Sequence, residues 1–139
     1  IKTYSLESTI AEKFDAILQR FELTGRMKDF YDIYYLSRTF DFDGAKLQVV
    51  IFETLQRCGT PYGRDSFKRV VALADDEDMQ KRWKYFPNNK DDTLEFPVVL
   101  AEIQTFHEPV FDTIVNEDEY LKKWIRNNFN WLINNPYLL

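Results

Sequence analysis

The sequence predicts an all-α fold, a single helical bundle, from three observations. Apolar residues recur at three- and four-residue spacing along most of the chain, which is the period of an amphipathic helix. The breaks between these stretches contain the residues Gly, Pro and Asn, which are typical of turns. The chain has 139 residues, of which 45% are hydrophobic and 17% aromatic, enough to bury one core. We therefore expect residues 1–139 to form one domain.

The N-terminal quarter predicts two helices joined by a short turn. A short strand is expected at residues 1–4, before a helix that begins near Ser5 or Leu6. The apolar stripe of this helix consists of Leu6, Ile10, Phe14, Ile17 and Leu18. The pair Thr24-Gly25 ends it, and a second helix follows over residues 26–38. Because the connection is short, the two helices should pack against each other.

Four further helical stretches follow. Asp43 is an N-cap candidate for a helix that ends near Cys58-Gly59, and residues 66–74 predict a shorter helix. Asp75 or Asp76 precedes the next, which reaches Phe86. Residues 92–116 predict one long helix, or two with a bend near Pro109. Residues 120–131 place Trp124 and Trp131 seven positions apart, but interleave them with asparagines, which are poor helix formers, so the conformation of this segment stays open.

Composition and charge exclude several classes of protein. The net charge of -5 argues against nonspecific binding of nucleic acid by the domain as a whole. No apolar run is long enough to span a bilayer, and Cys58 is the single cysteine, so we expect a soluble, cytoplasmic protein that does not bind membranes. The chain begins at Ile1 rather than Met. We expect it to be part of a larger protein.

Several catalytic chemistries lack their residues. His107 is the only histidine and lies 49 positions from Cys58, which makes a zinc cluster or a Cys-His dyad improbable; we expect His107 to be structural or exposed. The sequence contains neither a glycine-rich phosphate loop nor a Gly-x-Ser-x-Gly turn. We therefore expect no metal-ligand set within this chain.

Charged residues gather in the first two predicted helices. Lys13 and Arg20 are seven positions apart and share one helix face, while Asp29 and Asp32 are three apart and share another. If the helices pair, these cations and carboxylates meet. Spacing alone favours ordinary surface salt bridges, each worth about 0–1 kcal/mol.

The segments AEKFDAILQR and GRMKDFYDIYYL resemble a signature of the AbiEii family of nucleotidyltransferase toxins. The signature positions are occupied here by Lys13, Ala16, Arg20, Arg26, Lys28, Asp29 and Asp32. The resemblance covers most of the chain, and residues 4–36 carry its specific part. It implies the toxin of a two-gene toxin-antitoxin or abortive-infection system, which transfers nucleotides from a nucleoside triphosphate to RNA such as tRNA. A cognate antitoxin is the implied protein partner.

The family's other signature is a Gly-Ser turn followed by paired acidic residues on a strand, which hold Mg²⁺. This chain has no such turn, and we read Asp41-Phe42-Asp43 as a loop and a helix cap. The resemblance therefore implies that residues 1–139 are the helical C-terminal domain of a larger enzyme, whose catalytic N-terminal domain is absent here. Mg²⁺ is expected in the intact enzyme, and this chain alone is expected to be inactive.

The resemblance also implies roles for the charged residues. Lys13, Asp29 and Asp32 are the expected catalytic residues. The expected nucleotide-binding residues are Lys13, Arg20, Arg26 and Lys28, because ammonium and guanidinium groups both suit phosphate. Asp29 is assigned as a base or a metal-side carboxylate, and Asp32 as a residue that orients Lys13 or Arg20. The order of the two aspartates stays open.

A different class of function is a noncatalytic helical module that binds a protein through exposed aromatic side chains. In that case the charged residues are merely solvated. Tyr31 and Tyr34 are at helical spacing and are expected in the core rather than against a nucleobase, and the same holds for Trp83, Trp124 and Trp131.

Overall fold

The computed structural model describes residues 5–20, 27–86, 94–118, 120, 122–126 and 129–133. These residues are mostly helical, which confirms the predicted all-α fold class. Its helices are α1 (Leu6–Arg20), α2 (Met27–Thr39), α3 (Gly44–Cys58), α4 (Ser66–Val71), the 3-10 helix η1 (Ala72–Asp75), α5 (Glu77–Lys84) and α6 (Phe96–Val115). The predicted strand at residues 1–4 lies outside the described residues. Among those residues, no helix combines the length and the apolarity needed to cross a membrane.

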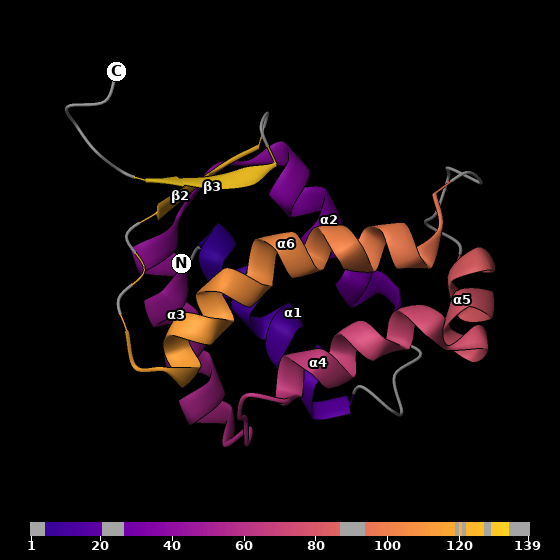
Figure 1. The fold of residues 1–139 in the computed structure, drawn as a ribbon, viewed down its shortest axis with the longest axis horizontal. Coiled ribbons are helices and arrows are strands. Elements are labelled where there is room, and N and C mark those ends of the chain that lie inside the picture. The colour runs from indigo at the N-terminus through magenta and orange to yellow at the C-terminus, as the bar shows by residue number, and fades with distance from the viewer. Residues whose placement is uncertain are drawn as a thin grey trace, which may run out of the picture.

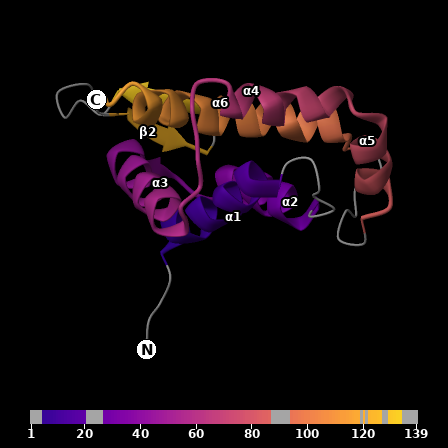
Figure 2. The ribbon, with the colours of Figure 1, turned by 90° about the horizontal axis from the view of Figure 1, so that it is seen from below.

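The helices form two layers. Helices α1, α2 and α3 lie on one side, and α4 and α6 lie on the other (Figures 1 and 2). Helix α6 contacts helices of both layers, and its buried face forms the centre of the core. This face explains why α6 is the most apolar helix in the sequence: it is covered by α2, α3, α4 and α5.

The helix boundaries follow the predicted capping residues. The Asp43 side chain accepts a hydrogen bond from the Ala45 N–H at the start of α3, and Asp76 accepts two at the start of α5. Gly59 ends α3 in the left-handed conformation, with φ of 64°. Pro109 lies inside one continuous helix, so the long predicted helix is not divided in two.

A small antiparallel sheet is the part of the fold that the all-helical prediction missed. Its strands are β1 (Phe42–Asp43), β2 (Lys122–Ile125) and β3 (Asn130–Ile133), in the order β1-β2-β3. Phe42–Asp43 was expected to be loop and cap; Asp43 does cap α3, but both residues also pair with β2. The structure thus corrects the loop assignment and keeps the cap.

Tryptophans attach this sheet to the helices. Trp124 and Trp131 are directly opposite each other across the β2–β3 pair and are both buried, which confirms their predicted place in the core. The Trp124 indole N–H donates to the Ser37 carbonyl of α2 at 2.6 Å, and that of Trp131 donates to the Phe106 carbonyl of α6 at 2.9 Å. The sheet therefore closes one end of the core.

Gly44 marks a close approach between α3 and the segment that leads into β2. A Cβ atom at Gly44 would lie 2.4 Å from the carbonyl oxygen of Lys122 and 2.6 Å from the ring of Tyr120. Only glycine allows the backbone of Lys122 to pass this close.

Candidate active site

The packing of α1 against α2 brings together Lys13 and the two aspartates of the predicted site. The Lys13 ammonium lies 3.5 Å from Asp29 Oδ1 and 3.0 Å from Asp32 Oδ2. Lys28 reaches the same Asp32 oxygen from the preceding turn of α2, also at 3.0 Å. We call these four residues the charged cluster. The expected meeting of cations and carboxylates is thus present in the structure.

The cluster extends from the protein interior to solvent. The Asp29 side chain is 3% exposed, Lys13 is 23% exposed and Asp32 is 24% exposed, whereas Lys28 is 61% exposed. A buried carboxylate is unfavourable unless a cation and hydrogen bonds compensate it. Lys13 provides that cation for Asp29, so this pair differs from an exposed surface salt bridge.

Local structure explains why these side chains converge. Asp29 lies in the first turn of α2, where the helix dipole favours a negative charge. Asp29 and Asp32 are three residues apart and face the same helix, α1. Phe14 of α1 and Phe30 of α2, which are sequence neighbours of the cluster residues, are buried in the core, and α1 packs directly against α2.

Two of the predicted nucleotide-binding residues lie outside this description. Arg26 is not among the described residues, and of Arg20 only the helical backbone is described. Lys13 and Lys28 are therefore the predicted phosphate-binding residues that the structure places in the cluster.

The charged cluster does not fit a magnesium site. Its two carboxylates both lie against the Lys13 ammonium, and the described residues contain no group of three or more His, Cys, Asp or Glu side chains that could hold a metal ion. Asp41 and Asp43 have the Asp-x-Asp spacing of a metal-binding motif, but each accepts a hydrogen bond from a backbone N–H. Asp41 accepts from Arg126, and Asp43 accepts from Ala45. We therefore assign no metal ligand to the described part of the chain.

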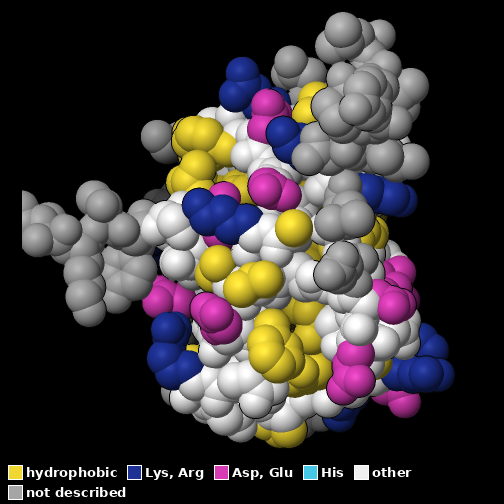
Figure 3. Space-filling view, turned by 90° about the vertical axis from the view of Figure 1, so that its left-hand side faces the viewer, with side chains coloured by type: hydrophobic (Ala, Val, Ile, Leu, Met, Phe, Trp, Pro, Cys, Tyr) yellow, Lys and Arg dark blue, Asp and Glu magenta, His cyan; other side chains and the backbone are white. Residues whose placement is uncertain are grey.

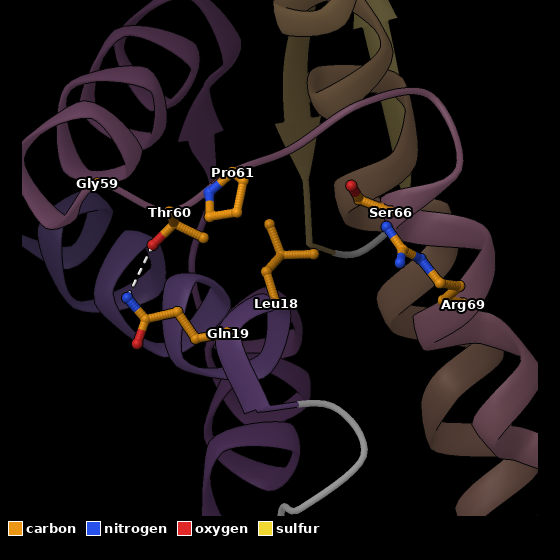
Figure 4. Close-up of a pocket in the computed structure, with 7 residues that line it drawn as sticks. All are labelled: Leu18, Gln19, Gly59, Thr60, Pro61, Ser66 and Arg69. Carbon is orange, nitrogen blue, oxygen red and sulfur yellow. Dashed lines mark hydrogen bonds between the residues drawn. The ribbon is translucent and has the colours of Figure 1, made fainter.

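A second polar feature, which sequence reasoning missed, lies at the C-terminal end of α1. A pocket of about 440 Å³ opens between α1, α4 and the loop that follows α3 (Figure 4). At its wall, the Gln19 amide donates to the Thr60 hydroxyl at 2.8 Å, and Thr60 in turn donates to the buried carboxylate of Asp15. In the sequence, Asp15 lies among the apolar residues Phe14, Ala16 and Ile17. A carboxylate in such a stretch is the one sequence feature that could have indicated a buried polar group here.

A family model described as "Nucleotidyl transferase AbiEii toxin, Type IV TA system" matches residues 1–119 of the chain. The chain belongs to the AbiEii family. Membership places it among the toxin-like nucleotidyltransferases of type IV toxin-antitoxin systems. No curated protein and no solved structure matches the chain.

The matched residues include every helix that the structure describes in the AbiEii chain and its charged cluster, whereas β2 and β3 come after the last matched residue. The family resemblance suggested by the sequences of α1 and α2 is therefore confirmed, and the match extends well beyond these two helices. The hairpin that closes the core lies outside the match.

Proposed function

We propose that the charged cluster binds the triphosphate of a nucleoside triphosphate and takes part in transferring the nucleotide to RNA such as tRNA. The observation that carries this proposal is the position of Lys13, which the buried Asp29 and the partly buried Asp32 hold at the boundary with solvent. An ammonium group fixed in this way is a preformed point charge for phosphate. Family membership supports the reaction class.

The four cluster residues would have different roles. Lys13 and Lys28 bind phosphate oxygens, assisted by Arg20 and Arg26. Asp29 is too buried to meet a substrate directly, and it orients Lys13 instead. Asp32 is accessible, so we assign it as the carboxylate that accepts the proton of the attacking hydroxyl.

In the proposed reaction, the acceptor hydroxyl oxygen forms a bond to the α-phosphorus while the bond from that phosphorus to the bridging oxygen breaks. Pyrophosphate leaves, and the hydroxyl proton passes to Asp32. Lys13 stabilises the negative charge that develops on the phosphate oxygens. We propose that the carboxylates for the expected Mg²⁺ come from a separate N-terminal catalytic domain, with residues 1–139 as the helical C-terminal domain.

The test is transfer of radiolabel from each of the four α-labelled nucleoside triphosphates to total RNA, with growth arrest scored in parallel. The full-length protein is compared with its Lys13→Ala and Asp29→Ala variants. We expect both to lose transfer by about a hundredfold or more, the usual scale for a lost charge-stabilising group. Both variants should also lose growth arrest.

Lys46→Ala is the matched control, because Lys46 also forms a cross-helix ion pair, 3.7 Å from Glu7, but lies 57% exposed on α3. It should transfer label normally. Transfer that is absent from the full-length protein, or indifferent to both substitutions, would contradict the proposal.

The alternative is a noncatalytic module that binds a protein partner such as the antitoxin. Exposed apolar side chains on α3 favour it, since Val49 is 51% and Phe52 44% exposed. Apolar patches are indeed visible in the space-filling view, but charged side chains separate them (Figure 3). Broken patches of this kind are common on ordinary protein surfaces, so the enzyme proposal remains the better supported.

A further inference from the structure

An exposed aromatic side chain lies beside the charged cluster. Of the aromatic residues in α2, Phe30 is fully buried, and Tyr31 and Tyr34 are partly buried against the core, where they were predicted. Tyr35 differs, because it is 53% exposed. Core packing therefore does not account for an aromatic residue at this position.

Tyr35 lies on the same face of α2 as two members of the cluster. Lys28, Asp32 and Tyr35 are spaced by four and three residues, so they form one continuous stripe on the helix. Neighbours in such a stripe have Cβ atoms about 5–6 Å apart. Tyr35 is consequently next to the carboxylate that binds both lysines.

The ring of Tyr35 is supported from one side. It stacks on Tyr31, with ring centroids 6.4 Å apart and an angle of 12° between the planes. Tyr31 in turn contacts Trp83, which belongs to the core, and Phe86, which packs against the core. The ring centroids are 6.3 and 6.0 Å from that of Tyr31. The Tyr35 ring is thus the exposed member of a group of aromatic side chains in contact that begins in the core.

We propose that Tyr35 stacks against the base of the nucleoside triphosphate whose phosphates lie at Lys13 and Lys28. This inference rests on the proposed function and adds the residue that recognises the base. Tyr35 lies seven positions after Lys28, a rise of about 10.5 Å along the helix, which leaves room for the ribose and the phosphates between the two ends of the ligand. Stacking selects for the presence of an aromatic base and accepts all four bases.

The test compares two ligands that share the phosphates and differ in the base: ATP and inorganic triphosphate. Their dissociation constants are measured by titration calorimetry for the full-length protein and for Tyr35→Ala, Tyr35→Phe and Lys13→Ala. We expect Tyr35→Ala to bind ATP about tenfold more weakly, within the range for one lost base-aromatic stack. Its affinity for triphosphate should be unchanged, and Tyr35→Phe should bind both ligands like the original protein.

Phe52→Ala is the control for removal of an exposed aromatic ring, since Phe52 is 44% exposed on α3. Equal weakening of both ligands by Tyr35→Ala, or no weakening of ATP, would overturn the stacking role. It would also be overturned if Tyr35→Ala bound ATP normally and a single-stranded oligonucleotide more weakly, since the ring would then serve the acceptor. Lys13→Ala should weaken both ligands; if it weakens neither, the proposed function fails, independently of what Tyr35 does.

Discussion

Replacing Trp124 by alanine is expected to lower the free energy of unfolding by about 3–5 kcal/mol, the range for a buried large-to-small substitution of an aromatic residue. Trp124 is 1% exposed and packs edge-on against Phe106 and Trp131, with ring centroids 5.0 and 5.5 Å away. The substitution also leaves the Ser37 carbonyl without its indole donor. Domains of this kind are stable by about 5–15 kcal/mol, so the loss is a large part of the total.

Chemical denaturation, followed by far-ultraviolet circular dichroism, measures this effect. Trp124→Phe retains a ring but removes the indole donor, so its loss should be smaller than that of Trp124→Ala. Leu132→Ala is the control in the same sheet, because Leu132 is 43% exposed, and it should change stability by less than about 0.5 kcal/mol. A loss below about 1 kcal/mol for Trp124→Ala would mean that the hairpin does not pack on the core as described.

Acidification below pH 6.5 is expected to destabilise the protein through His107. The ring is fully buried, stacks on Phe14 at 4.3 Å, and neither of its nitrogens has a hydrogen-bond partner among the described residues. Burial without such partners lowers the pKa of His107 from 6.5 to about 3. The predicted structural role of this histidine is therefore that of an aromatic core residue.

The sign of the pH effect follows from proton binding. Between pH 6.5 and about 3 the unfolded chain binds a proton at His107 that the folded chain does not bind. This contribution to stability is complete above pH 6.5 and falls as the pH is lowered, by up to about 1.4 kcal/mol per pH unit.

His107→Phe removes this titrating group and keeps a ring in the core. The difference in unfolding free energy between His107→Phe and the original protein should increase as the pH falls from 6.5 to 4. A constant packing penalty in the variant would shift this difference without changing its slope. Parallel stability curves for the two proteins over this range would refute the buried neutral histidine.

The helices were predictable because their signals are local. Apolar spacing placed the stripe of α1, and short-range capping chemistry at Asp43, Gly59 and Asp76 placed the helix ends. The charged cluster was also within reach, because residues of two adjacent helices joined by a short connection must meet. What spacing could not provide was the burial of Asp29, which distinguishes it from the more exposed Asp32.

The features that were missed depend on contacts between distant parts of the chain. Trp131 lies seven positions after Trp124, a spacing that in a helix would place both on one face. In the structure they pair across the β2–β3 hairpin instead. The first strand of this hairpin also pairs with Phe42–Asp43, about eighty residues earlier in the chain. Asp15 and Thr60 are 45 residues apart, and only the packing of α1 on α3 joins them. No local pattern encodes either contact.

The most direct test of the account asks which lysines lie at the nucleotide phosphates. An acyl-phosphate derivative of ATP transfers its acyl group to a lysine amine near the phosphates, with release of ATP, and mass spectrometry then identifies the modified residue. We predict that Lys13 and Lys28 of the full-length protein are acylated and that excess ATP suppresses this, while labelling of Lys46 is insensitive to ATP. If Lys13 and Lys28 are not acylated, or if their acylation persists unchanged under excess ATP, the charged cluster does not bind the triphosphate.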